Sequence, residues 1–210
     1  MSIEKAYDAW ATRYDTDRNR TRDLDSTSTA ATLSNYNFQR VLDLGCGTGK
    51  NTEWLLNRAE RIIGLDFSQA MLDIAKEKVA NNRAQFIKAD LTSEWSIDAQ
   101  WADLVTSSLT LEHIENLGPI FEQSNRTLAE NGLFFISELH PYKQYDGSGA
   151  RFESENGTVH IEVFTHHLTD YISSAKTNGF ELLEMREWFD SPARGEIPRL
   201  ISFLFRKKIS

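Results

Sequence analysis

Three glycines spaced two residues apart, in GCGTG at residues 45–49, end the apolar run that opens the stretch VLDLGCGTGKNTEWL. Glycines at a strand-to-helix bend let the backbone approach a ligand closely, and the free amides at the helix start attract an anionic group. A P-loop would need Ser or Thr after its lysine, but Lys50 is followed by Asn51. Lys50 also stands where the dinucleotide fingerprint needs its last glycine. The stretch therefore favours a ligand without a diphosphate.

Two aspartates and a pair of small polar residues mark the ends of the next predicted strands. Asp66 closes IIGLD, Asp90 closes FIKAD, and Thr106 and Ser107 lie in WADLVTSSLTLEHI. Ligands of open α/β sheets bind outside the carboxyl ends of the strands, so these side chains and the glycine turn should line one crevice. Asp66 could accept hydrogen bonds from both hydroxyls of a ribose, and Asp90 or the Leu91 amide could meet an adenine edge. S-adenosylmethionine, with an amino-acid end, a ribose and an adenine, has that shape.

Two histidines near strand ends are candidate proton acceptors in a reaction. His113 in LEHI follows the fourth predicted strand and His140 in ELHPY follows the fifth. An imidazole titrates near neutral pH and could take a proton from a hydroxyl or amine, although either residue could simply cap or pack a short helix. Glu138, Tyr142 and Arg151 are candidate substrate contacts, and Arg151 could equally be an ordinary surface charge. Nothing in this spacing is diagnostic of a metal, and no metal site is expected.

The elements that position these residues alternate between short β-branched or leucine-rich runs and longer segments of helical period, which is typical of βαβ proteins. Strands are predicted at 40–44, 61–66, 84–89, 102–107, 132–138, 181–188 and 200–206. Helices are predicted at 51–58, 68–80, 116–128 and 168–178. The first five strands should be parallel. The last two are separated only by a short polar segment and should form an antiparallel pair at one edge.

Two stretches stand outside that alternation. Residues 1–37 hold an amphipathic piece with Tyr7 and Tyr14 and then a polar run, and we expect a helical lid followed by a second helix. Residues 140–165 hold glycines and alternating apolar residues, and we expect a small hairpin that lies over the acceptor pocket. With no composition boundary along the chain, residues 1–210 should form a single domain.

Composition limits the partners. The chain has 210 residues and 40% apolar content, enough for one sizeable core. Its net charge of -8 disfavours nucleic acid and anionic membranes as partners. Cys46 is the only cysteine, which excludes an intramolecular disulfide and a multi-cysteine metal site and favours a reducing, cytoplasmic compartment. With no leader and no apolar run of about eighteen residues, we expect a soluble monomer or homodimer.

The segments VLDLGCGTGKNT, GLDFSQAML, FIKADL, ADLVTSSLTLEHI and LAENGLFFISE resemble, in order and spacing, the motifs of class I S-adenosylmethionine-dependent methyltransferases. The match covers about residues 38–140, and the small-molecule type, similar to the methyltransferase-11 and methyltransferase-25 groups, is the nearest. The resemblance implies a Rossmann-like α/β fold with a mostly parallel seven-stranded sheet, an antiparallel C-terminal strand and helices on both faces. It also implies an enzyme that uses S-adenosylmethionine and releases S-adenosylhomocysteine.

Site roles follow from the same resemblance. The glycine loop and Asp43 would line the methionine end, Phe67 and Met71 would flank the adenine unless they are core packing, and Tyr14 would contact the cofactor from the lid. The implied cofactor-binding residues are Tyr14, Asp43, Gly45, Cys46, Gly47, Gly49, Asp66, Phe67, Met71, Asp90, Leu91, Thr106 and Ser107.

Three functions stay open at this point. The leading hypothesis is methyl transfer by in-line displacement to an oxygen, nitrogen or carbon atom of a small molecule. SSLT stands where amino-methylating nucleic-acid enzymes carry Asn/Asp-Pro-Pro-Tyr/Phe, which favours a small-molecule acceptor. The alternatives are an NAD(P)-binding Rossmann oxidoreductase, disfavoured by Lys50, and a non-catalytic protein that binds S-adenosylmethionine. The acceptor and the need for a general base are not readable from the sequence.

Overall fold

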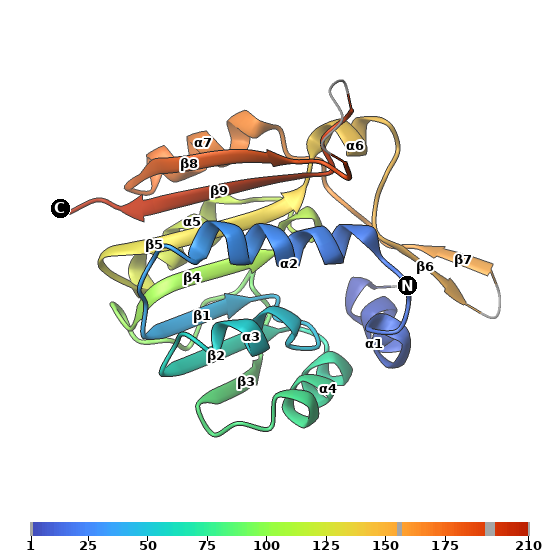
Figure 1. Cartoon of the computed structure of the whole chain (residues 1–210), viewed down its shortest axis with the longest axis horizontal. Coiled ribbons are helices and arrows are strands. Elements are labelled where there is room, and N and C mark those ends of the chain that lie inside the picture. Colours follow the sequence, from blue (N-terminus) through green and yellow to red (C-terminus); the bar gives the residue numbers. More distant parts are fainter. Residues whose placement is uncertain (1, 155–156, 192–195, 210) are drawn as a thin grey trace.

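The computed structural model, drawn in Figure 1, describes residues 2–154, 157–191 and 196–209. Its helices are α1 (Ile3–Tyr14), α2 (Arg20–Leu33), α3 (Lys50–Leu55), α4 (Gln69–Val79), the 3-10 turn η1 (Leu111–His113), α5 (Gly118–Thr127), α6 (Pro141–Tyr145) and α7 (Leu168–Thr177). Its strands are β1 (Arg40–Leu44), β2 (Arg61–Asp66), β3 (Ala84–Lys88), β4 (Ala102–Ser108), β5 (Leu128–Leu139), β6 (Arg151–Ser154), β7 (Gly157–His160), β8 (Phe180–Trp188) and β9 (Leu200–Lys207).

Seven strands form the main sheet in the order β3-β2-β1-β4-β5-β9-β8. β1 to β5 are parallel to their neighbours, whereas β9 runs antiparallel to both β5 and β8. Parallel neighbours need long crossovers, and α3, α4 and α5 supply them after β1, β2 and β4. The predicted fold class, a mostly parallel seven-stranded sheet with antiparallel strands at the C-terminal end, is confirmed.

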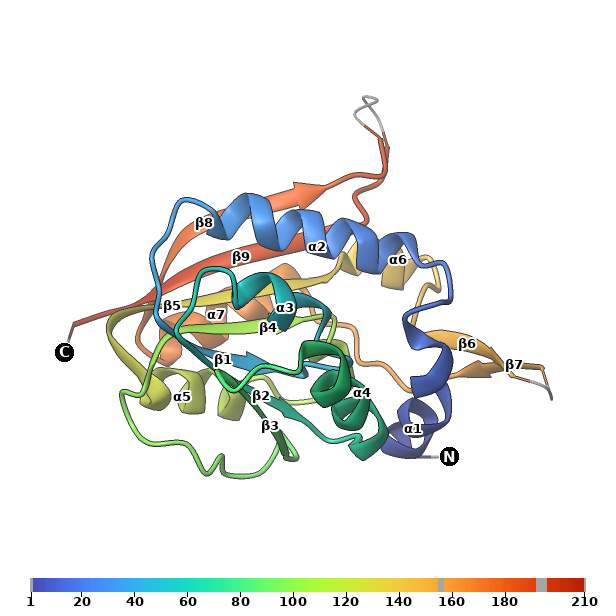
Figure 2. The ribbon, with the colours of Figure 1, turned by 60° about the horizontal axis from the view of Figure 1, so that its bottom comes forward.

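Helices cover both faces of this sheet because successive side chains of a strand point to opposite sides. Leu42 and Leu44 of β1 pack into the core under α5 and α7, while Val41 packs into the core under α2 and α3. Figure 2 shows α2, α3 and α4 on one face of the sheet and α5 and α7 on the other. The expected helices on both faces are therefore present.

Two segments stand beyond the carboxyl ends of the parallel strands. One is α1, and the other is the β6–β7 hairpin, which lies beside it in Figures 1 and 2. The Trp10 ring of α1 stacks on Phe152 of β6, with centroids 5.2 Å apart and planes 13° from parallel. In contrast, α2 packs on the sheet face against β5 and β9. Of residues 1–37, α1 and the start of α2 thus lie at the strand ends, while the rest of α2 covers the sheet face.

The core beneath α5 holds an aromatic cluster that fixes this helix to the sheet. The Phe121 ring lies 5.2 Å from Phe134, 6.0 Å from Phe180 and 5.7 Å from Phe205, each in an edge-to-face arrangement. All four side chains are buried. Such pairs add stabilisation beyond the apolar area they bury.

Phe121→Ala should lower the free energy of unfolding by about 3–5 kcal/mol, because it leaves a cavity among three other rings. Urea denaturation followed by circular dichroism would measure this. Phe189→Ala is the matched control, since Phe189 is 37% exposed and its loss should cost less than about 0.5 kcal/mol. Equal losses for the two variants would contradict the packing described here.

Candidate active site

All three glycines of the turn after β1 have a left-handed backbone, and two of them line the cavity described below. Gly45 has φ 65° and Gly47 has φ 52°, values that residues with a side chain rarely adopt. A Cβ on Gly45 would also lie 2.1 Å from the Thr110 hydroxyl, whereas nothing lies within 4 Å of a Cβ on Gly47. Gly45 is therefore needed for close packing, and Gly47 exposes its backbone to a ligand.

Asp66, at the end of β2, ties that turn to the start of α4. Its Oδ2 accepts a hydrogen bond from the Gly47 amide at 2.9 Å, and its Oδ1 accepts one from the Ser68 amide at 2.8 Å. Burial raises the pKa of Asp66 to about 6, while these amide donors lower it. The carboxylate is thus held by the backbone with lone pairs left over for a ligand.

Asp43 lies beneath the turn. Its two oxygens accept hydrogen bonds from the hydroxyls of Thr52, at 2.7 Å, and Thr106, at 2.8 Å. Burial raises the pKa of Asp43 to about 6. The hydroxyl of Thr106 is therefore occupied in joining β4 to β1, and the Ser107 side chain is fully buried next to it. These residues support the floor of the site.

A cavity of about 590 Å³, here called the glycine-loop cavity, opens where the turn, Asp66 and α1 meet. The predicted cofactor residues that line it are Tyr14, Gly45, Gly47, Asp66, Phe67, Met71, Asp90 and Leu91. Those outside its lining are Asp43, Cys46, Gly49, Thr106 and Ser107. Gly49, with φ 77°, directly precedes α3 and packs on α4, and the Cys46 side chain is buried against Gly64.

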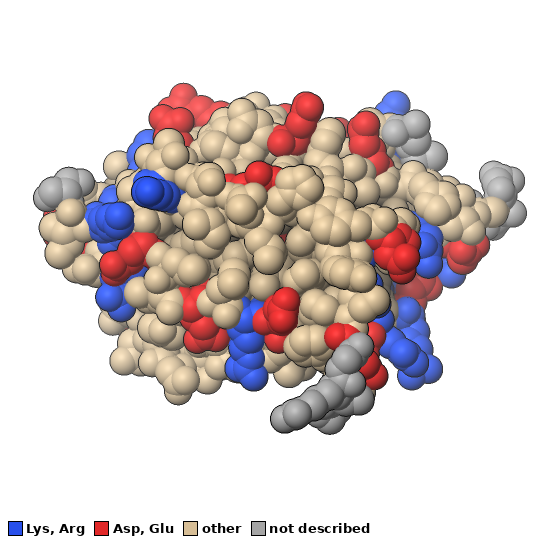
Figure 3. Space-filling view, turned by 90° about the horizontal axis from the view of Figure 1, so that it is seen from above, with Lys and Arg blue, Asp and Glu red and all other residues tan. Residues whose placement is uncertain are grey.

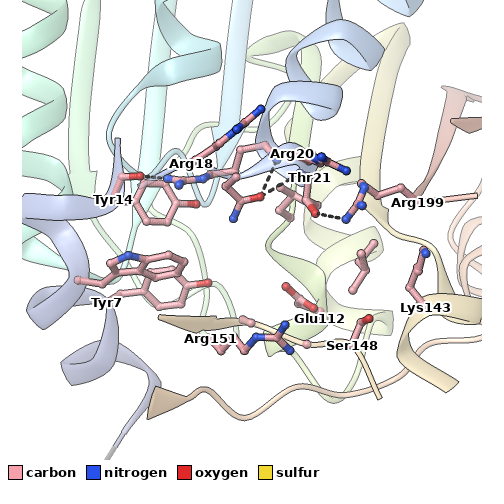
Figure 4. A pocket seen from close by; sticks show the side chains of 17 residues that line it. Tyr7, Tyr14, Arg18, Arg20, Thr21, Glu112, Lys143, Ser148, Arg151 and Arg199 are labelled. Carbon is pink, nitrogen blue, oxygen red and sulfur yellow. Dashed lines mark hydrogen bonds between the residues drawn. The ribbon is translucent and has the colours of Figure 1, made fainter. Parts of the chain in front are cut away.

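A second cavity of about 390 Å³, here called the cationic cavity, shares Tyr7, Tyr14 and Leu109 with the first. It lies between α1, the start of α2, α6 and β6, and Figure 4 shows its lining. One acidic side chain, Glu112, is part of that lining. The six cationic side chains of the lining are Arg18, Arg20, Arg22, Lys143, Arg151 and Arg199.

Tyr7 and His113 form a hydrogen-bonded pair in the wall of the glycine-loop cavity, and Tyr7 also faces the cationic cavity. His113 Nδ1 lies 2.8 Å from the Glu162 carbonyl oxygen, which can only accept, so Nδ1 carries the hydrogen. Nε2 then accepts from the Tyr7 hydroxyl at 2.8 Å. Burial lowers the pKa of His113 and raises that of Tyr7 well above its usual value, so both groups are neutral at pH 7.

Glu112 is a carboxyl that sequence reasoning missed. It is 7% exposed, and Gln144 Nε2 donates to its Oε2 at 3.4 Å. Burial raises its pKa to about 7, so both protonation states are populated near neutral pH. The only sequence signal was its position next to His113 in LEHI.

The remaining predicted site residues fall in different places. Glu138 is 1% exposed and its Oε1 accepts hydrogen bonds from the Thr110 amide at 2.9 Å and the Leu111 amide at 2.8 Å. His140 caps α6, where its Nδ1 accepts from the Tyr142 amide at 3.1 Å, and its Nε2 lies 3.3 Å from Glu187. The Tyr142 side chain is 52% exposed. None of these three lines either cavity.

Neither a metal site nor a membrane span appears in the part of the chain that the structure describes. No group of three or more His, Cys, Asp and Glu side chains within these residues could hold a metal ion. No helix among them is long and apolar enough to cross a bilayer.

Comparison with known proteins finds a methyltransferase domain within the chain. Residues 42–136 match the family model described as "Methyltransferase domain". A methyltransferase of Emericella nidulans is 25% identical over 86% of this chain and 76% of its own length. A trans-aconitate 2-methyltransferase of Variovorax paradoxus is 33% identical over 46% of this chain and 37% of its own length. The chain spans 61% of a relative from Haemophilus influenzae, with 27% identity.

Solved structures share the whole architecture. An S-adenosylmethionine dependent methyltransferase from Mesorhizobium loti superposes with a TM-score of 0.73, covering 88% of this chain and 98% of that one at 20% identity. The N-methyltransferase NodS of Bradyrhizobium japonicum, in complex with S-adenosyl-L-homocysteine, has a TM-score of 0.74 over 99% of both chains at 14% identity. Residues 42–136 thus belong to the methyltransferase-domain family, and the chain has the fold of the class I S-adenosylmethionine-dependent methyltransferases that its motifs predict.

Burial of Glu138 makes the folding stability of the protein depend on pH. Its pKa is raised to about 8 by burial, above the ordinary value of 4.5, so the folded state binds its proton more tightly than the unfolded state. Stability should therefore fall as the pH rises from about 4.5 to 8. Above pH 7 Asp43 and Asp66, with pKa values of about 6, are mostly ionised and contribute little further slope, whereas Glu112, with a pKa of about 7, still contributes part of it.

Glu138→Gln keeps an oxygen for the two amides and removes the ionisation, so it should reduce the loss of stability between pH 7 and 8.5 and leave the part that Glu112 contributes. Urea denaturation of the ligand-free protein at several pH values would measure this slope. Glu130→Gln, at an exposed position, should leave the slope unchanged. A slope that Glu138→Gln does not alter would mean that the carboxyl is already ionised at pH 7.

Proposed function

We propose that this chain binds S-adenosylmethionine in the glycine-loop cavity and transfers its methyl group to a small molecule in the cationic cavity. The observation that carries the proposal is the meeting of the two cavities at Tyr7, Tyr14 and Leu109. A donor in the first cavity and an acceptor in the second would lie next to each other at this shared wall. Holding two reactants in such a geometry is worth roughly 7–11 kcal/mol of a reaction barrier.

The residues of the glycine-loop cavity fit the cofactor. Asp66 offers carboxylate lone pairs for ribose hydroxyls, and the open backbone at Gly47 admits close approach of the amino-acid end. Phe67 and Met71 supply apolar surface, and Asp90 supplies an exposed carboxylate for an adenine edge. A volume of about 590 Å³ lies within the range of cofactor sites.

S-adenosylmethionine supplies, when bound, a methyl group already activated by a sulfonium. In an in-line displacement the acceptor atom forms a bond to the methyl carbon while the bond between that carbon and sulfur breaks, and its electrons stay on sulfur. The chain then has to position the acceptor and exclude water. We assign the covering role to α1 and, among the described residues, to 140–154 and 157–165, since Trp10 of α1 stacks on Phe152 of β6.

The chain also offers groups for a proton. If the nucleophilic atom carries one, the Glu112 carboxylate in the cationic cavity is placed to accept it, with its pKa raised to about 7 by burial. His113 holds the Tyr7 hydroxyl in one orientation at the junction of the cavities. The oxygen of that hydroxyl has lone pairs left to orient the acceptor. We assign the proton-accepting role expected of His140 to these residues instead, because His140 caps α6 and lines neither cavity.

A first test measures cofactor binding. Asp66→Ala should weaken binding of S-adenosylhomocysteine by at least about tenfold in calorimetry, because a hydrogen bond to a charged acceptor is worth about 1.5–3 kcal/mol. Asp73→Ala, on the exposed side of α4, is the matched control and should bind normally. Circular dichroism would show whether both variants fold. Unchanged affinity in a folded Asp66→Ala protein would refute the assignment.

A second test concerns the proton. For an acceptor with an O–H or N–H nucleophile, turnover should rise with pH through about 7, because Glu112 must be ionised to accept the proton. Glu112→Gln should lower turnover about a hundredfold and remove this rise, within the usual range for a general base. Glu115→Gln, three residues away and exposed, should keep both the rate and the pH profile in assays of tritiated methyl transfer. A pH profile shared by all three proteins would exclude the role.

A further inference from the structure

The strongest unexplained feature of the molecule is the charge of the cationic cavity. The whole chain is acidic, with 31 Asp and Glu against 23 Lys and Arg. On the face shown in Figure 3, basic and acidic side chains are interspersed. The cavity instead gathers six cationic side chains against the single carboxyl of Glu112. A small cavity lined in this way concentrates positive potential and attracts anions.

Most of these cations make no direct ion pair with a carboxylate. The pKa of Asp190 is lowered chiefly by its hydrogen bond from Arg199, and the charges of Arg20 and Lys143 lower it further from a distance. Within the described residues, the side chains of Arg18, Arg20, Lys143 and Arg151 make no hydrogen bond or ion pair. The Arg22 guanidinium donates to the backbone carbonyls of Tyr14 and Asp17 and lies 4.1 Å from the Tyr14 ring centroid.

Arg199 differs from the others because it is paired with Asp190 at 2.6 Å, while its second amino group donates to the Thr21 hydroxyl at 3.2 Å. Asp190 therefore neutralises only one of the six positive charges by direct contact. Arg20 and Arg151 are exposed and Lys143 is partly exposed, so their charged groups are free to bind an anion that enters the cavity.

The cations come from opposite sides of the cavity. Figure 4 shows Arg20 and Arg199 along one side and Lys143 and Arg151 on other parts of the wall, with Glu112 between them, while Arg18 extends away from the centre. Arg20 begins α2, Lys143 lies in α6 and Arg151 begins β6. One anionic group can bind the cations on one side of the cavity only. The arrangement therefore suits a molecule with two anionic groups.

We propose that the methyl acceptor is a small molecule with at least two anionic groups, carboxylates or phosphates, which Arg20, Lys143, Arg151 and Arg199 bind. This inference rests on the proposed function, since it names the substrate class of the same site. Bidentate contacts from arginine suit both kinds of anion. The positive potential also disfavours cationic amines as acceptors, because they would face both these side chains and the sulfonium of the donor.

The test uses the full chain saturated with S-adenosylhomocysteine and measures binding of four probes by calorimetry. Tricarballylate represents carboxylates and pyrophosphate represents phosphates, while glycerol and putrescine are the neutral and cationic comparisons. We expect at least one anionic probe to bind at least tenfold more tightly than glycerol and putrescine, and more weakly as salt is raised. The tighter of the two anions identifies the kind of group.

Variants show whether the binding is in the cavity. Lys143→Gln and Arg151→Gln should each weaken binding of the preferred anion about tenfold or more, since each removes a charge-assisted contact. Lys76→Gln and Arg61→Gln remove exposed charges from α4 and from the amino end of β2, and they should leave the affinity unchanged.

The outcomes separate the two proposals. If S-adenosylhomocysteine itself does not bind, the proposed function fails. If it binds but no anionic probe exceeds glycerol and putrescine, or the exposed variants weaken the anion as much as the cavity variants, the acceptor class is wrong and the methyltransferase proposal stands.

Discussion

The carboxylate of Asp66 is the contact on which the site depends. It accepts amide hydrogen bonds from Gly47 in the turn after β1 and from Ser68 at the start of α4. The Ser68 hydroxyl in turn donates to Asp8 of α1 at 2.6 Å. One buried side chain therefore sets the glycine turn, the first turn of α4 and, through Ser68, the helix that covers the cavity. Parallel strands make this possible because they place the ends of β1 and β2 side by side.

Charge is distributed unevenly across the two cavities. Asp43 and Glu138 are buried beneath them, Asp66 and Glu112 are buried in their walls, and burial raises the pKa of all four carboxyls. The cations, in contrast, come from the segments that cover the strand ends, α2, α6, β6 and the residue before β9. A positively charged group would be favoured on the side of the buried acids, and an anionic group on the side of the arginines. The same fold can thus hold partners of opposite charge next to each other.

The strands of the sheet could be predicted from the sequence, whereas the cationic cavity could not. Asp66 and Asp90 could be found because each ends an apolar strand, and strand ends converge in any parallel sheet. The hairpin in residues 140–165 is present as β6 and β7. Arg20, Lys143 and Arg199 come from distant segments with no shared periodicity, so only the folded chain shows that they meet. Local backbone geometry also decides the role of His140. Pro141 begins α6, so the His140 imidazole caps that helix.

The shape of both cavities depends on how α1 is held in place, chiefly by the packing of Trp10 on Phe152. Its rim contacts, Lys88 with Glu4 at 2.7 Å and Lys78 with Asp15 at 3.1 Å, are partly exposed ion pairs worth about 1 kcal/mol or less each. Its inner face buries Trp10 against Phe152, a contact whose apolar area contributes more. Tyr7 and Tyr14, which form the wall between the cavities, lie on the same helix. Any displacement of α1 that admits a ligand therefore also removes the wall at which the two ligands would meet, so the complete site forms only when this helix is packed in place.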